Sequence, residues 1–332
     1  MAEMNKKNKL FSSIIRTIPD DILVFSVLNP KKDITKKFIM ENYINFYSFK
    51  VTDDNYVVLR FEDFMKGGNF EEIDYCFIPI DFMKKYNSDL RIVKKLIEEG
   101  YLITLPISKK YISFYAEEPE GVHLITIYDI DIEKGIFLCK DFQGHNFVEF
   151  EVQFEDMKKG LIDYDRVFLR GPEGLQALRL RDSDNTRIDY SKVFLEFYKL
   201  QQDFSTKTEG HGIGALNLVT KDINERYKDF LKANEWYNYA NYLRESSKLM
   251  NLRYNILQEE MEGDKNADGR LMLEKLEKDT GKLFFNVEKK IYKGKKLTKE
   301  EFENFYYLFL ECKEDFRKTA EMFCDKIEKY LK

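Results

Sequence analysis

The stretch from residue 101 to residue 153 constrains the fold most, because apolar segments alternate there with short turns. Four strands are expected: YLITLPI (101–107), HLITIYDI (123–130), IFLCKDF (136–142) and NFVEFEV (146–152). The five residues DIEKG between the second and third strands have the length and composition of a hairpin turn. This stretch therefore predicts an antiparallel sheet at the centre of the N-terminal half.

The hairpin also predicts which side chains meet. If residues 131–135 form its loop, Ile125 lies opposite Asp141, and His123 is the diagonal neighbour of Asp141. Such neighbours have backbones roughly 7–8 Å apart, a distance that a carboxylate and an imidazole can close to a hydrogen bond. A histidine oriented by an acid is two thirds of a nucleophilic triad. The alternatives are that His123 is a core residue with satisfied hydrogen bonds and that Asp141 only caps a turn.

Composition limits the classes of protein. The chain has 332 residues, of which 43% are apolar, so it can bury a substantial core and is not expected to be disordered. Its net charge is −5 with both signs interspersed, which argues against a nucleic-acid-binding surface. No apolar run approaches the roughly 18 residues of a membrane span, and the first residues are too polar for a secretory signal. We expect a cytoplasmic protein that does not enter membranes.

The cysteines and histidines are too scattered for a structural metal site. Cys76, Cys139, Cys312 and Cys324 form no close pair, which predicts reduced thiols, and the three histidines lack metal-ligand spacing. No cofactor motif is evident either, because the glycines of EGHGIG (209–214) lack the features of a phosphate-binding loop and predict a flexible turn. Cys139 shares a strand face with His123 but lies about 13 Å away along the strands, so it is expected to be a core residue.

A polar, turn-rich run (residues 171–187) divides the chain. The expected fold class is α+β, with one domain at 1–178 and an all-helical domain at 188–332. The last segment (299–331) has a capping box at Thr298 and Glu301 and phenylalanines at helical spacing. This stripe comprises Phe302, Phe305, Phe309, Phe316 and Phe323. It predicts a buried interface, either inside the helical domain or across a homodimer.

Three stretches together resemble a known family. LRIVKKLIEEGYLITLPIS, GVHLITIYDIDIEKGIFLCKDF and the following FEDMKKG are similar to papain-like proteins of thiotemplated antibiotic assembly lines, including butirosin-type acyltransferases. The later HGIGALNLV…YNYANYLRESSKLMNLRYNIL is similar to their helical region. The resemblance covers residues 90–170 well and 210–257 loosely. It implies a papain-like first domain, with His123 and Asp141 matching the histidine and aspartate of the family's triad.

The chain departs from this family at the nucleophile. The family places a cysteine near the N-terminus at the head of a helix, whereas the matching stretch, residues 20–38, contains none. The apolar segment before Asn29 and Pro30 predicts a strand that ends at these two residues. Ser26 carries the only hydroxyl group in this segment. A serine is the poorer nucleophile and would depend on His123 as its base.

The resemblance therefore implies three functions. The first is an enzyme of natural-product biosynthesis that transfers an acyl or aminoacyl group from a carrier-protein thioester to a small-molecule amine. The second is a catalytically inactive relative that binds a carrier protein or the product. The third is a cysteine-peptidase-like hydrolase. The missing cysteine argues against this function as strongly as against the acyl-transfer enzyme.

Overall fold

The computed structural model describes residues 24–51, 56–63, 69–86, 90–143, 146–164, 173–261 and 267–332. The chain divides into two compact units, and the class is α+β, as the sequence predicts. The first unit comprises residues 1–29 and 68–183, and the second comprises residues 30–67 and 184–332.

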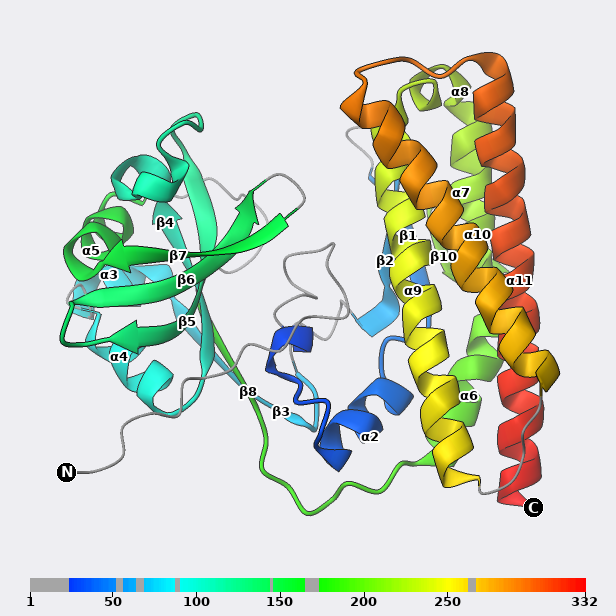
Figure 1. Ribbon diagram of the computed structural model, residues 1–332, viewed down its shortest axis with the longest axis horizontal. Helices are drawn as coiled ribbons and strands as arrows, with labels where there is room; N and C mark the ends of the chain where they lie inside the picture. Colours follow the sequence, from blue (N-terminus) through cyan, green and yellow to red (C-terminus); the bar gives the residue numbers. More distant parts are fainter. Residues whose placement is uncertain are drawn as a thin grey trace. The chain divides into compact units, whose positions relative to one another are not determined.

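The first unit is built on a six-stranded antiparallel sheet (Figure 1). Its strands, in order across the sheet, are β3 (Ile73–Pro79), β8 (Gly174–Leu180), β4 (Leu102–Ser108), β5 (Val122–Asp131), β6 (Ile136–Gln143) and β7 (Asn146–Gln153). Its helices include α3 (Ile80–Tyr86), α4 (Arg91–Glu98) and α5 (Phe154–Ile162), with two 3-10 turns, η2 (Lys109–Tyr111) and η3 (Ser113–Tyr115).

The core of the first unit lies between one face of this sheet and its helices. Val93 and Ile97 of α4 and Met157 of α5 are fully or almost fully buried in one apolar cluster with the strands. Helix α4 is followed by a glycine that ends it, since Gly100 adopts a φ of 87° and its amide donates to the carbonyl of Ile97 at 2.9 Å. A glycine tolerates this left-handed conformation best. The chain can then turn directly into the fully buried strand β4.

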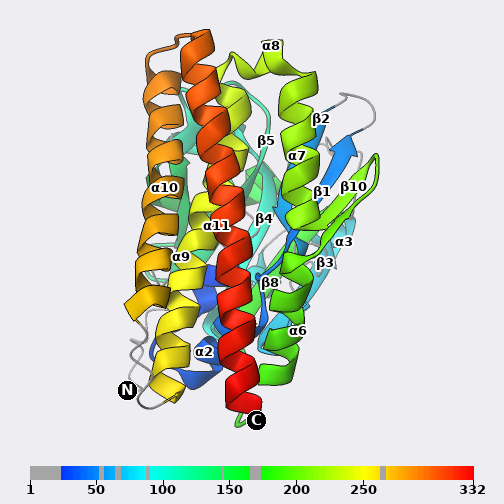
Figure 2. The same cartoon turned by 90° about the vertical axis from the view of Figure 1, so that its right-hand side faces the viewer.

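The second unit combines a four-stranded antiparallel sheet with long helices. Its strands, in order, are β2 (Tyr56–Phe61), β1 (Phe46–Val51), β10 (Glu209–Gly212) and β9 (Asp203–Ser205). Its helices are α2 (Asp33–Glu41), α6 (Tyr190–Gln201), α7 (Ile213–Glu225), α8 (Tyr227–Phe230), α9 (Ala233–Glu260), α10 (Ala267–Tyr292) and α11 (Lys299–Leu331). Figure 2 shows the long helices running alongside one another, with α7 against the sheet.

This arrangement differs from the predicted division at 1–178 and 188–332. The division after Ser183 falls inside the predicted polar run, but residues 30–67 belong to the second unit. The reason is strand pairing between distant segments, with Tyr47 of β1 opposite His211 of β10. The second unit is therefore not all-helical, and residues 209–212 form a strand where a flexible turn was expected.

Two further expectations concern single segments. The apolar run before Asn29 was expected to be a strand, but residues 24–27 are helical, because a short apolar run does not by itself distinguish a helix from a strand.

The capping box of α11 is present, and all five phenylalanines of its stripe are buried. Phe316 packs edge-on against Phe46 at 5.2 Å, and Phe323 stacks on Phe197 at 4.2 Å. The stripe is thus covered by the unit's own elements and gives no support to a homodimer.

Candidate functional site

His123 lies at the start of β5 in the first unit. Gly121 precedes the strand, and His123 pairs with Ile107 of the buried neighbouring strand β4. The alternation of β5 turns Ile125 and Ile127 into the core on the same face as His123. The imidazole sits at the end of this face, and its side chain is 41% exposed. It is therefore anchored by a buried strand while remaining accessible to solvent.

Asp141 lies on the adjacent strand, and its carboxylate contacts His123. The distance between His123 Nε2 and Asp141 Oδ2 is 2.6 Å, and the aspartate side chain is only 9% exposed. Near the pair, the register is the predicted one, because Ile127 lies opposite Cys139. At the hairpin end it is shifted by one residue, so Asp131 rather than Ile130 lies opposite Ile136. A bulge between Ile127 and Asp129 absorbs the difference.

Tyr115 is a third member of the cluster that sequence reasoning missed. It ends the 3-10 turn η3, is 3% exposed, and donates its hydroxyl hydrogen to Oδ2 of Asp141. Its ring lies 5.2 Å from the imidazole of His123. Burial, followed by the charge of Asp141, holds the pKa of Tyr115 well above its usual value, so it remains a donor. No periodicity marks such a residue, because it comes from irregular chain between strands.

The hydrogen bonds to Asp141 indicate which nitrogen of the His123 ring carries the proton. Oδ2 of Asp141 accepts the tyrosine hydroxyl, and the carboxylate can only accept from Nε2 of His123. In the neutral ring, the proton is therefore inferred to lie on Nε2, which leaves the lone pair on Nδ1. No residue in the described part of the chain hydrogen-bonds to Nδ1. An unprotonated Nδ1 on this side chain, which is 41% exposed, can accept a proton.

Aromatic and charged side chains surround Tyr115. Phe114 stacks on Phe150 at 3.8 Å, and the ring of Phe150 lies 6.0 Å from that of Tyr115. The ammonium group of Lys109 lies 6.0 Å from the Tyr115 ring centroid and pairs with Glu118 at 2.9 Å. These contacts hold the tyrosine from more than one side, so the hydrogen-bonded carboxylate has little freedom to move.

Ser26 has a different setting from the one expected of a nucleophile. It is 3% exposed and lies in the helical residues 24–27. The hydrogen bonds among the described residues include none between Ser26 and His123. A serine needs an adjacent base to be activated. Its role as a nucleophile thus stays a prediction without a supporting contact.

The four cysteines are unpaired thiols in packed surroundings. Cys139 is fully buried two residues before Asp141, and burial followed by the aspartate charge raises its pKa. Burial also raises the pKa of Cys312, and that of Cys324 to about 11. Cys76 lies half-buried on β3 against the core cluster. A raised pKa suppresses the thiolate that acts as a nucleophile, so none of the three shifted thiols is activated.

Within the part of the chain that the structure describes, no group of three or more metal-ligating side chains converges. The helices described there include none with the length and apolarity to cross a lipid bilayer. In comparisons with known proteins, no family model and no curated protein matches the chain.

Proposed function

We propose that the first unit catalyses acyl transfer to an amine, with His123 as general base and Asp141 and Tyr115 as positioning residues. The observation that carries the proposal is the 2.6 Å contact from a buried carboxylate to a half-exposed imidazole. General bases are oriented in this way when they act on a substrate proton. The resemblance of residues 90–170 to papain-like acyltransferases supports the choice of reaction.

In the proposed reaction, a small-molecule amine attacks the carbonyl carbon of a carrier-protein thioester directly. The carbon–nitrogen bond forms and the carbon–sulfur bond breaks, giving an amide and a thiol. Nδ1 of His123 accepts the proton that the amine loses and delivers it to the leaving thiolate. Asp141 stabilises the transient imidazolium. Direct transfer is preferred because, among the described residues, no thiol or hydroxyl hydrogen-bonds to His123.

The same observation also favours a second candidate, a catalytically inactive relative that binds a carrier protein. Because no thiol or hydroxyl among the described residues hydrogen-bonds to His123, a peptidase that works through an acyl-enzyme is less well supported than either. In each case, the carrier protein follows from the resemblance and the cytoplasmic location from the composition of the chain, and both belong to the proposal.

The test uses acyl and aminoacyl thioesters of N-acetylcysteamine as donors and hydroxylamine as a generic amine. Hydroxamate formation is measured by mass spectrometry for the wild-type protein and for His123→Gln. We expect a loss of about 10²–10⁴-fold in the enzyme-dependent rate, the usual contribution of a general base. His211→Gln is the matched control, because His211 is also half-exposed and also contacts a carboxylate, that of Glu62 at 3.3 Å. Equal rates for wild type and His123→Gln would favour the binding protein.

A further inference from the structure

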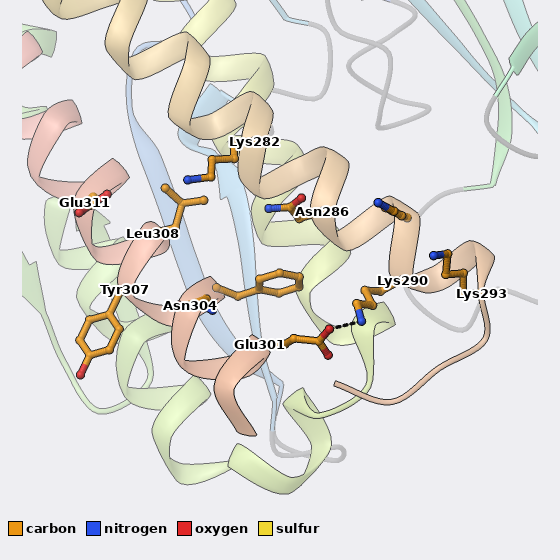
Figure 3. A pocket seen from close by; sticks show the side chains of 11 residues that line it. Lys282, Asn286, Lys290, Lys293, Glu301, Asn304, Tyr307, Leu308 and Glu311 are labelled. Carbon is orange, nitrogen blue, oxygen red and sulfur yellow. Dashed lines mark hydrogen bonds and ion pairs between the residues drawn. The ribbon is translucent and has the colours of Figure 1, made fainter. Parts of the chain in front are cut away.

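A groove of about 660 Å³ lies between α10 and α11 in the second unit. Helix α10 contributes Lys282, Asn286, Lys289 and Lys290, which share one helix face, and Lys293 follows one residue after its end. Figure 3 shows Lys282 and Asn286 on α10, with Leu308 of α11 opposite them. The volume falls within the range of about 300–1,000 Å³ that is typical of small-molecule sites.

The groove carries an excess of positive charge in a protein whose net charge is −5. Four lysines line it, against the carboxylates Glu301 and Glu311. Glu301 is already engaged, because it accepts from Lys290 and closes the capping box with Thr298. Within the described residues, Lys282, Lys289 and Lys293 form no ion pair. The free lysines therefore outnumber the remaining carboxylate, Glu311.

Local structure alone does not account for this charge. Lys289 lies in the last turn of α10 and Lys293 follows one residue after its end, so two ammonium groups that form no ion pair within the described residues line the groove at this terminus. The helix dipole favours lysines in the last turn of α10, but Lys282 lies ten residues before the terminal Tyr292. An anion between Lys289 and Lys293 would offset their repulsion.

The opposite side of the groove, formed by α11, carries apolar side chains between the polar Glu301, Asn304 and Glu311. Phe305 and Leu308 of α11 line it and are 5% and 7% exposed. The amide of Asn304, on the same helix, adds a hydrogen-bond donor. A cationic wall that faces the apolar side chains of Phe305 and Leu308 suits a ligand with an anionic end and an apolar body.

We propose that this groove binds an organic phosphate, with the phosphate between Lys289 and Lys293 and the organic part over Phe305 and Leu308. Phosphate is favoured over a single carboxylate because it can accept hydrogen bonds from several ammonium groups at once. The site is distinct from the His123 cluster, and the inference does not depend on acyl transfer.

The test is calorimetric titration of the full chain with phenyl phosphate, inorganic phosphate and phenol at low ionic strength. We expect saturable binding of phenyl phosphate, weaker binding of inorganic phosphate and none of phenol. The double variant Lys289→Gln/Lys293→Gln should lose at least tenfold in affinity for phenyl phosphate. Circular dichroism establishes that the variant is folded.

Lys278→Gln is the matched control, since Lys278 is exposed on the same helix but does not line the groove. Its affinity should stay within twofold of wild type. The proposal is overturned if wild type shows no saturable binding, or if Lys278→Gln loses as much affinity as the double variant. Binding to phosphatidylserine vesicles without binding of phenyl phosphate would also overturn it, and would assign the patch to a membrane surface.

Discussion

Nε2 of His123 and Oδ2 of Asp141 lie 2.6 Å apart across the neighbouring strands β5 and β6. The register that brings them together is fixed inside the core, where Ile127 pairs with Cys139 and both are fully buried. A slip of one residue would turn these apolar side chains to the other face. The geometry of the candidate base is thus tied to the stability of the sheet.

Replacing Tyr115 by phenylalanine should loosen the strands around Asp141. The change removes a buried donor to the carboxylate, and such bonds to charged groups contribute about 1.5–3 kcal/mol. Hydrogen–deuterium exchange of β6 amides should show a decrease of that size in the opening free energy. Tyr111→Phe is the control, because its bond to Asp163 is exposed, and it should change exchange by less than about 0.5 kcal/mol. Equal effects of the two variants would contradict the role given to Tyr115.

The first unit should lose stability in alkali. The pKa values of Tyr115 and Cys139 are raised in the folded state, so the unfolded chain releases these protons at lower pH than the folded one. Below about pH 8.5, the ordinary pKa of a thiol, both protonated groups contribute fully to the free energy of unfolding. The contribution of Cys139 falls as the pH rises above this value, and that of Tyr115 falls above about pH 10, the ordinary pKa of tyrosine. Exchange of β6 amides, corrected for the intrinsic rate, should report a falling opening free energy. In Tyr115→Phe the opening free energy should fall less steeply above about pH 10. An unchanged slope would contradict the contribution assigned to Tyr115.

Alkylation should show that the buried thiols are inert. Iodoacetamide should modify Cys139 and Cys312 much more slowly in the native protein than in denaturant, because burial suppresses their thiolate forms. Peptide mapping gives the rate for each site. The half-buried Cys76 is the informative case, and Cys76→Ala should retain any acyl-transfer activity. Loss of activity on this substitution would restore a cysteine enzyme.

Two glycines in helices should respond in opposite ways to alanine. A Cβ at Gly214 would lie 2.2 Å from the carbonyl oxygen of Phe204, whereas one at Gly281 would meet nothing within 4 Å. Gly214→Ala should therefore destabilise the second unit by more than about 2 kcal/mol. Gly281→Ala should stabilise it by up to about 1 kcal/mol. Fluorescence of Trp236, the chain's single tryptophan and a buried residue of this unit, reports both in urea. If Gly214→Ala left the stability of the unit unchanged, the close approach of Phe204 to Gly214 would not be required for folding.

Elements with strong local signals were predictable from the sequence. The hairpin of β5 and β6, helix α4 and its glycine stop, and the capped helix α11 all carry their periodicity within a single segment. The His123–Asp141 pair followed from the hairpin, because diagonal neighbours on a sheet depend only on register.

Features that depend on distant segments were not predictable. Residues 34–49 have helical spacing, yet α2 ends at Glu41 and β1 begins at Phe46, where it pairs with β10 more than 160 residues later. Long-range pairing of this kind leaves no local pattern. Tyr115 was not predicted for the same reason, since its partner Asp141 lies 26 residues away and its own segment is a 3-10 turn. The bulge beside Ile127 was hidden because it leaves the alternation of the apolar residues near His123 unchanged.

The most direct test of the His123–Asp141 base is the tautomer of the imidazole. A long-range nitrogen–proton correlation spectrum of the ¹⁵N-labelled protein separates protonated from unprotonated ring nitrogens, and loss of one set of signals in His123→Gln assigns them. At roughly pH 8.5, where an ordinary imidazole is neutral, His123 should carry its proton on Nε2 and have an unprotonated Nδ1. In Asp141→Asn this single tautomer should give way to a mixture. A wild-type His123 protonated on Nδ1, or an equal mixture of tautomers, would contradict the proposed base.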